Sequence, residues 1–321
     1  MFAQARRATV LVILLLTSPA VAQDKWPEHV IKLVVPYPPG GVADALARHV
    51  GRIVERDLGQ PIVIENRGGA GSNIGSNVVA KSPADGYTIL LGSTANAVNM
   101  SLYKKIPYDT LRDFIPVSLL ADVPTVLVVN ASLPVKSVAE LIAYAKQRPG
   151  ELTYASAGPG SPAHIAAELF LRASGVRIRQ VAYRGGGPAV VDVIGGHVNL
   201  MFTNLQAVFA GIEFGSLRLL GTGGTKRWPA FPEVPTIAEA GVPGYEASAW
   251  YGLLLPAGTP APIVARLQRA LEGVRSADSL KSIRKFGADP VVSTPDLLQR
   301  RLEAEIKSYA KLIRETGIGV E

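Results

Sequence analysis

Apolar segments of strand length alternate with segments of helical periodicity along most of this chain. The first apolar run covers residues 31–35, and residues 43–58 then carry apolar side chains at helical spacing. The same pattern predicts strands at residues 61–65, 88–92, 152–156, 180–184, 198–202 and 217–221, and helices at residues 73–81, 163–173 and 188–194. Because strands that alternate with helices form parallel sheets covered on both faces, the chain is predicted to be an α/β protein.

Two long extended runs break this alternation, the first over residues 116–129 and the second over residues 245–255. A second series of strands and helices lies between them, and helical periodicity returns after Thr259 and again from Thr294. The mature length of about 300 residues exceeds what one hydrophobic core usually holds. We therefore predict two lobes joined by the extended runs. Residues 23–124 and 248–321 form a discontinuous lobe 1, and residues 125–247 form lobe 2.

The N-terminal segment has the three parts of a secretory signal peptide. Arg6 and Arg7 precede an apolar run over residues 10–16, and the Ala-Val-Ala sequence at residues 20–22 supplies a cleavage site. The apolar run is too short to span a bilayer. We predict that residues 1–22 are removed and that the mature protein is periplasmic.

Composition excludes several classes of site. The chain has no cysteine, so it has neither a disulfide nor a thiolate zinc site, and its 4 histidines are too dispersed for metal ligation. The formal net charge is +7, with basic residues scattered rather than clustered, which argues against nucleic-acid binding. A mildly positive field favours small anions. We expect no metal, no cofactor and no nucleic-acid partner.

The loop after the first strand has the sequence PYPPGGVAD at residues 36–44. Gly40 and Gly41 have no side chains, so their backbone N–H groups can approach a bound molecule closely. The helix that follows adds unpaired N–H groups and the positive end of its dipole. The segment is therefore a candidate anion site, with Asp44 expected to stabilise the first helical turn.

A second loop repeats this design at residues 154–164, where a strand ends in the sequence SAGPGSP before a helix. Ser161 is a favoured N-cap residue and Pro162 a favoured first helical residue. The N–H groups of Ala163 and His164 are expected to point out of the helix and to hold an anion.

Each loop alone is also typical of an ordinary strand-to-helix connection, so the structural interpretation stays open for both. Two such loops in two α/β units favour binding, because open α/β sheets bind ligands beyond the carboxyl ends of their strands. Other candidates at strand ends are Ser93, Thr94 and Asn96, together with Tyr183, Thr203 and Asn204. Their structural alternatives are a half-buried tyrosine and plain polar turns.

A hydrolase activity and a nucleotide-binding site are two alternatives to simple ligand binding. A secreted hydrolase would use Ser161 or Ser156 as nucleophile and His164 as base, although no third orienting group is evident. A nucleotide site would use the partial Gly-x-Gly pattern at residues 69–75, which is weak evidence by itself. The chain lacks the G-x-S-x-G elbow, the H-E-x-x-H pattern and the P-loop lysine. We therefore expect a binding protein and not an enzyme.

Several segments together resemble the substrate-binding proteins of tripartite tricarboxylate transporters, the Bug or TctC family. The matching segments run in order along nearly the whole mature chain: PYPPGGVAD at residues 36–44, ENRGGAGSNIG at residues 65–75, DGYT at residues 85–88, YASAGPGS at residues 154–161 with His164, YRG at residues 183–185, and residues 250–260.

The resemblance implies a two-lobed periplasmic binding protein of type II, with a ligand cleft between lobes that closes like a flytrap. It implies a small dicarboxylic, aromatic or related organic acid as ligand and the permease subunits of the transporter as partners, with a sensor role as an alternative. We expect a monomer. Carried onto this chain, the resemblance puts these residues in the cleft: Tyr37, Pro38, Gly40, Gly41 and Asp44 on one wall, Ala157, Gly158, Ser161 and His164 on the other, and Tyr183 nearby. The family commonly has aspartate where this chain has Thr203, which argues against an amino-acid ligand.

Overall fold

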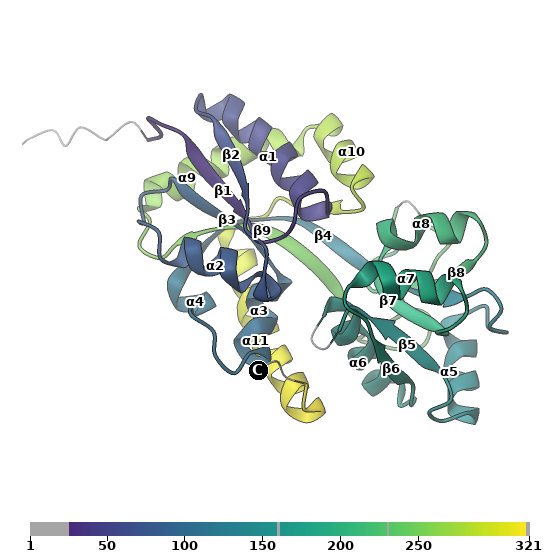
Figure 1. Ribbon diagram of the computed structural model, residues 1–321. Coiled ribbons are helices and arrows are strands. Elements are labelled where there is room, and N and C mark those ends of the chain that lie inside the picture. The colour runs from purple at the N-terminus through teal and green to yellow at the C-terminus, as the bar shows by residue number, and fades with distance from the viewer. Residues whose placement is uncertain (1–25, 159–160, 230, 319–321) are drawn as a thin grey trace, which may run out of the picture.

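The computed structural model describes residues 26–158, 161–229 and 231–318, and the predicted signal peptide lies outside these ranges. Two α/β lobes lie side by side and are joined by two long antiparallel strands (Figure 1). These strands are β4 (Phe114–Asn130), which leaves the first lobe, and β9 (Ser248–Pro256), which returns to it. Each long strand pairs with sheet strands of the lobe it enters, so the two lobes share a continuous β connection.

The first lobe contains a sheet in the order β2-β1-β3-β9-β4. Its strands β1 (Ile31–Val35), β2 (Ile62–Asn66) and β3 (Thr88–Ser93) are parallel, and β9 runs antiparallel to β3. Its early helices are α1 (Val42–Leu58), α2 (Asn73–Ala80), α3 (Thr94–Leu102) and α4 (Thr110–Asp113), with a short 3-10 turn η1 (Ala70–Ser72). The C-terminal part of the chain completes this lobe with α9 (Ala261–Ala270), η2 (Leu271–Arg275), α10 (Ala277–Lys285), β10 (Asp289–Pro290) and α11 (Pro295–Thr316).

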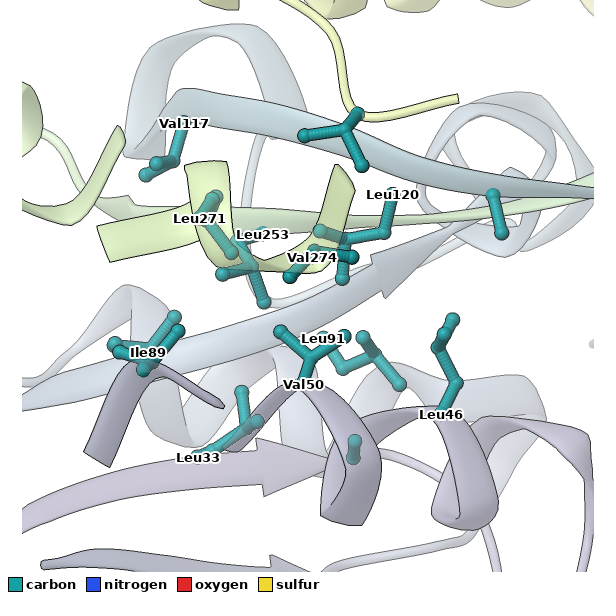
Figure 2. Packing of buried hydrophobic residues seen from close by; sticks show 14 of the residues in the cluster. Leu33, Leu46, Val50, Ile89, Leu91, Val117, Leu120, Leu253, Leu271 and Val274 are labelled. Carbon is teal, nitrogen blue, oxygen red and sulfur yellow. The ribbon is translucent and has the colours of Figure 1, made fainter. Parts of the chain in front are cut away.

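The core of the first lobe explains why the discontinuous C-terminal segment belongs there. Leu46 and Val50 on α1 pack towards Leu33 and Leu91 of the sheet, and Val274 of η2 fills the space above them (Figure 2). All five side chains are buried. Since removing apolar surface from water is the main favourable term in folding, the C-terminal helices close a core that the N-terminal residues leave open.

The second lobe repeats the same arrangement with different strands. Its sheet has the order β6-β5-β7-β4, and β8 pairs with the other side of β4. The strands are β5 (Thr153–Ser156), β6 (Arg179–Ala182), β7 (Leu200–Asn204) and β8 (Leu217–Thr222). Helices α5 (Val138–Gln147), α6 (Pro162–Ser174), α7 (Gly186–Ile194) and α8 (Leu205–Glu213) cover this sheet.

The strand predictions are confirmed with shifted ends, and the predicted helices at residues 163–173 and 188–194 are α6 and α7. The prediction missed α3, α4, α8 and α10. Helix α3 escaped detection because four of its nine residues are Thr, Asn or Ser, so its apolar stripe is weak. Ser93 and Asn96 form its capping box instead of a polar loop.

The last helix, α11, packs against α3 and against the long strand β4 (Figure 1). Its Arg301 forms ion pairs with Asp122 of β4 at 2.6 Å and with Glu305 at 2.8 Å. The indole of Trp250 on β9 donates to Glu305 at 2.8 Å. These contacts attach both connecting strands to one helix of the first lobe. None of the described helices combines the length and apolar character needed to cross a membrane.

Candidate functional site

A cavity of about 340 Å³ lies where the two lobes meet. The first lobe contributes residues at the end of β1 and at the junction of β3 and α3. The second lobe contributes the start of α6, and the connecting strands β4 and β9 supply the remaining wall. Because the carboxyl ends of strands and the N-termini of helices converge here, the cavity occupies the position where open α/β sheets bind ligands.

Three predicted site residues of the first lobe line this cavity: Tyr37, Ser93 and Thr94. The hydroxyl groups of Tyr37 and Ser93 share a hydrogen bond of 2.6 Å, and Tyr37 meets the ring of Tyr251 edge-on at 6.1 Å. Burial raises the pKa of Tyr37, and the hydrogen bond with Ser93 opposes this rise only in part. The phenol is therefore neutral at physiological pH and can donate or accept a hydrogen bond.

Thr94 is held in place by a connecting strand. Its Oγ1 accepts the backbone N–H of Trp250 at 3.0 Å. Ser93, the N-cap of α3, accepts the N–H of Ala95 at 3.3 Å. The N-terminus of α3 thus faces the cavity with its polar groups fixed by neighbouring backbone.

Ser161 and Pro162 bring the start of α6 into the same cavity. The prediction that Ser161 caps this helix and that Pro162 is its first residue is confirmed. The prediction for His164 needs correction, because its backbone N–H donates to Ser161 Oγ at 3.3 Å instead of remaining free. Pro162 has no N–H, and the N–H of His164 is bonded to Ser161. The N–H of Ala163 therefore has no acceptor within the first turn of the helix.

The first predicted loop lies beside the cavity, and only Tyr37 of its residues contributes to the lining. Pro38, Gly40 and Gly41 are exposed. The N–H of Gly40, which was expected to face a ligand, donates to Asp44 Oδ2 at 3.1 Å. Gly40 has φ of +90°, a conformation that favours glycine. A Cβ at either glycine meets no atom within 4 Å, so open space lies above this loop.

Asp44 stabilises the loop and the first turn of α1, as expected for an acid at this position. Its Oδ2 accepts both the Gly40 N–H and Arg48 Nε, the latter at 3.0 Å. Burial opposes ionisation, but the hydrogen bonds from Arg48 and Gly40 outweigh it and keep the pKa of Asp44 below its usual value. The carboxylate is therefore charged and paired with Arg48.

The second predicted loop is likewise closed by its own contacts. The N–H of Gly158 donates to Ser156 Oγ at 3.2 Å, and Gln180 Nε2 donates to the same oxygen at 2.8 Å. Gly158 has φ of +110°, which turns the chain towards Ser161. Ala157 and Gly158 are half-buried and do not line the cavity.

The remaining predicted residues lie inside the second lobe. His164 is buried, stacks on Tyr154 and lies 3.7 Å from Glu168. Burial lowers the pKa of His164, and Glu168 offsets this only in part, so the imidazole is neutral at pH 7. The Ser161–His164 pair needed by a hydrolase is replaced by a cap: Ser161 Oγ accepts the main-chain N–H of His164.

Tyr183 and Thr203 also lie outside the cavity lining. Tyr183 donates its hydroxyl to Asp192 at 2.6 Å, and burial together with this bond raises the pKa of Tyr183 to about 12. Thr203 pairs with Val126 in the sheet. Both therefore have structural roles in the present arrangement.

The sequence prediction missed most of the residues that line the cavity. Those from helices are mainly apolar, and those from β4 and β9 belong to the connecting strands. They include Val98, Leu102, Ile165, Ala166, Leu169, Thr125, Ala247, Ala249, Tyr251 and Tyr309. An apolar residue at helical spacing predicts a core position, so the sequence carries no signal that separates a cavity wall from a core.

Among the described residues that line the cavity, none has a formally charged side chain. No group of His, Cys, Asp and Glu in the described part of the chain could hold a metal ion. The cavity is lined by hydroxyl groups and by the first residues of α3 and α6. This arrangement can bind a solute reversibly through hydrogen bonds and dipoles.

The two lobes, the two connecting strands and the cavity between the lobes define a solute-binding protein of the type II periplasmic class. The family model described as "Tripartite tricarboxylate transporter family receptor" matches residues 46–318. The chain therefore belongs to the TctC or Bug family of solute-binding receptors, which are not enzymes. Both the predicted fold and the family resemblance are confirmed.

Individual relatives agree with this assignment. Protein BugT of Bordetella pertussis is 43% identical over 300 residues, which is 92% of each chain. The solved structure of Rhodopseudomonas palustris Rpa4515 with adipate is 42% identical, with a TM-score of 0.80, and covers 92% of this chain and 99% of that one. The periplasmic binding protein BugD is 31% identical, with a TM-score of 0.77 over 92% of this chain and 100% of its own.

A further relative from Rhodopseudomonas palustris, MatC with bound malate, is 31% identical, with a TM-score of 0.75, and covers 90% of this chain and 100% of that one. At 14% identity and a TM-score of 0.54, the sulphonate-binding protein SsuA of Escherichia coli shares the fold alone. Relatives with different small acids thus have the same two-lobed architecture.

Proposed function

We propose that this protein captures a small carboxylate in the periplasm and delivers it to the permease subunits of a tripartite transporter. The observation that carries the proposal is the cavity between the lobes, whose lining includes the first residues of both α3 and α6. Helix N-termini attract anions through unpaired N–H groups and the helix dipole. Support also comes from two relatives whose structures were solved with adipate and with malate.

Because the hydroxyl groups of Tyr37 and Ser93 share one hydrogen bond, one of the two has a proton left for the carboxylate. We assign this hydroxyl and the N–H of Ala163 as the donors. Tyr37 and Ser93 of the first lobe line the cavity, and Ala163 of the second lobe follows the lining residues Ser161 and Pro162. A ligand that bridges the lobes binds the closed arrangement better than the open one. Only this difference in affinity can shift the population towards closure. The exposed glycines of the first loop then cover the bound acid.

We further propose that the lobes move as units that divide at residues 124/125 and 247/248, within and at the start of the two connecting strands. The protein acts as a monomer, and its closed form is what the permease recognises. Cleavage after residue 22 releases it into the periplasm. This division follows the change of pairing partners, since β4 pairs with β9 up to Pro124 and with β7 from Thr125.

A thermal-shift screen with mono- and dicarboxylic acids tests the binding function, because a ligand that binds only the folded state raises its apparent stability. At least one acid is expected to raise the Tm in a concentration-dependent way. Absence of any shift across the panel, checked by calorimetry, would contradict carboxylate binding.

A variant pair tests the place of the first loop. Gly41→Trp adds an indole above the loop without a clash, because no atom lies within 4 Å of a Cβ there. It is expected to abolish the ligand-induced shift while leaving the Tm of the free protein within about 2 °C of the wild type. Ala143→Trp, at an exposed position on α5, is the matched control and should bind normally. Normal binding by Gly41→Trp would remove the first loop from the site.

A further inference from the structure

One side of the cavity is apolar and is built from both lobes. Val98 and Leu102 on α3 face Ile165 and Leu169 on α6 across it. The same cluster includes Leu312 and Ile313 of α11, and all of these residues except Leu169 are buried. Helices α3, α6 and α11 therefore form a continuous hydrophobic seam between the lobes on this side of the connecting strands.

Two polar side chains on this side, Asn99 and Thr125, are already bonded within the protein, and Tyr103 and Tyr309 add only neutral hydroxyl groups. Asn99 donates to the backbone carbonyl of Gly71 at 2.7 Å and to Asn73 Oδ1 at 2.8 Å. Thr125 Oγ1 donates to the carbonyl of Ala247 at 2.5 Å. No charged side chain occurs among the described lining residues. A second carboxylate placed here would lose its hydration without gaining a cationic partner, which is costly.

The size of the cavity sets the largest apolar part that a bound ligand can have. A protein cavity of about 150 Å³ lined by aliphatic and aromatic residues is enough to hold benzene. The cavity here is about 340 Å³. It therefore has room for a six-carbon chain or an aromatic ring in addition to a carboxylate at the polar end.

We propose that the ligand is a monocarboxylate with an uncharged hydrocarbon or aromatic body. This inference rests on the proposed function and narrows it. The carboxylate lies at the polar end formed by Tyr37, Ser93 and the start of α6. The hydrocarbon body lies against Val98 and Ile165 and excludes water from the seam. Short hydroxylated diacids leave this seam unfilled.

Isothermal titration calorimetry with a matched series of acids tests the proposal. Hexanoate and adipate have the same six-carbon length and differ in one terminal group, methyl against carboxylate. Hexanoate is expected to bind at least tenfold more tightly than either adipate or malate. From butanoate to hexanoate, affinity should rise about fourfold for each added methylene.

The outcomes separate the ligand class from the function. Tighter binding of adipate or malate than of hexanoate overturns the monocarboxylate inference and leaves carboxylate capture intact. Equal affinity of butanoate and hexanoate also overturns it, because the seam then contributes nothing. If no acid in the series binds, the proposed function fails and the inference fails with it.

A pair of isosteric variants tests whether Val98 causes the preference for hexanoate over malate. Val98→Thr replaces one methyl group of the seam with a hydroxyl, and Val54→Thr makes the same change in the buried face of α1, away from the cavity. Only Val98→Thr is expected to lower the hexanoate-to-malate affinity ratio, by at least threefold. An unchanged ratio would contradict the assignment. Should Val98→Thr fail to fold, Leu169→Asn, at a half-buried lining position, gives the same readout.

Discussion

The hydroxyl groups of Tyr37 and Ser93 lie 2.6 Å apart and join two strand-to-helix junctions of the first lobe. Tyr37 follows β1, whereas Ser93 ends β3 and caps α3. This hydrogen bond therefore links two loops of the cavity wall that the sequence pattern predicted as separate candidate sites. The two residues are more than 50 positions apart in the sequence.

Replacing Tyr37 by phenylalanine removes this bond and keeps the ring. We expect Tyr37→Phe to lower the free energy of unfolding by about 1 kcal/mol, the usual net value of a hydrogen bond, and to weaken ligand binding. Urea unfolding and titration calorimetry measure the two effects. Tyr87→Phe, whose hydroxyl accepts an exposed backbone N–H from Glu28, is the control and should bind ligand like the wild type. Unchanged ligand affinity in Tyr37→Phe would show that this hydroxyl does not contact the solute.

The adjacent glycines of the first loop differ in what they require of the backbone. Gly40 has φ of +90°, whereas Gly41, the N-cap of α1, has φ of −87°. Gly40→Ala is expected to cost about 1–2 kcal/mol of stability, and Gly41→Ala less than about 1 kcal/mol, the usual difference between glycine and alanine at an N-cap. Space does not distinguish them, since a Cβ meets nothing within 4 Å at either position. Equal unfolding free energies for the two variants would contradict a backbone origin of the difference.

Arg301 holds the connecting strand β4 and the helix α11 together through partly buried ion pairs. Its side chain is 17% exposed, and those of Asp122 and Glu305 are 29% and 19% exposed. Arg301→Ala leaves both carboxylates without their cation and is expected to lower the unfolding free energy by about 2–3 kcal/mol.

The surface pair of Arg227 and Glu239 is the control for Arg301, because both of its side chains are about half exposed. Arg227→Ala is expected to cost less than about 1 kcal/mol. Chemical denaturation of both variants under one set of conditions gives the comparison. A smaller loss in Arg301→Ala than in Arg227→Ala would contradict a stabilising role for the buried pairs.

The buried imidazole of His164 makes stability depend on pH. Burial lowers the pKa of His164 below its ordinary value of 6.5. Below pH 6.5 the unfolded chain therefore binds a proton that the folded chain excludes. The stabilisation is complete above this pH and is lost as the pH falls towards the folded-state pKa. We expect the unfolding free energy to decline between pH 7.5 and 5.5.

The variant His164→Gln isolates this contribution. It is expected to flatten the decline, although His49, whose pKa burial also lowers, retains its share. A His164→Gln protein with the wild-type slope would rule out His164 as the source. Ligand affinity in this variant should stay within about threefold, because the imidazole packs on Tyr154 away from the cavity.

The sequence predicted the parts of this protein whose cause is local. Strand and helix periodicity, the Ser161-Pro162 start of α6 and the Thr294 start of α11 all depend on residues within a turn or two of one another. The two extended runs were also predictable, because they are longer than ordinary strands. The motifs in order along the chain identified the family.

Tertiary structure decided which of those residues meet and which face the cavity. Gly40 and Gly158 keep the turns that their sequence context indicates, but their N–H groups donate to Asp44 and Ser156 within the loops. The cavity wall instead uses apolar side chains such as Val98 and Ile165, which come from helices of different lobes. Their spacing along each helix is the same as that of a core residue. Only the packing of the two lobes against each other determines that a space remains between them.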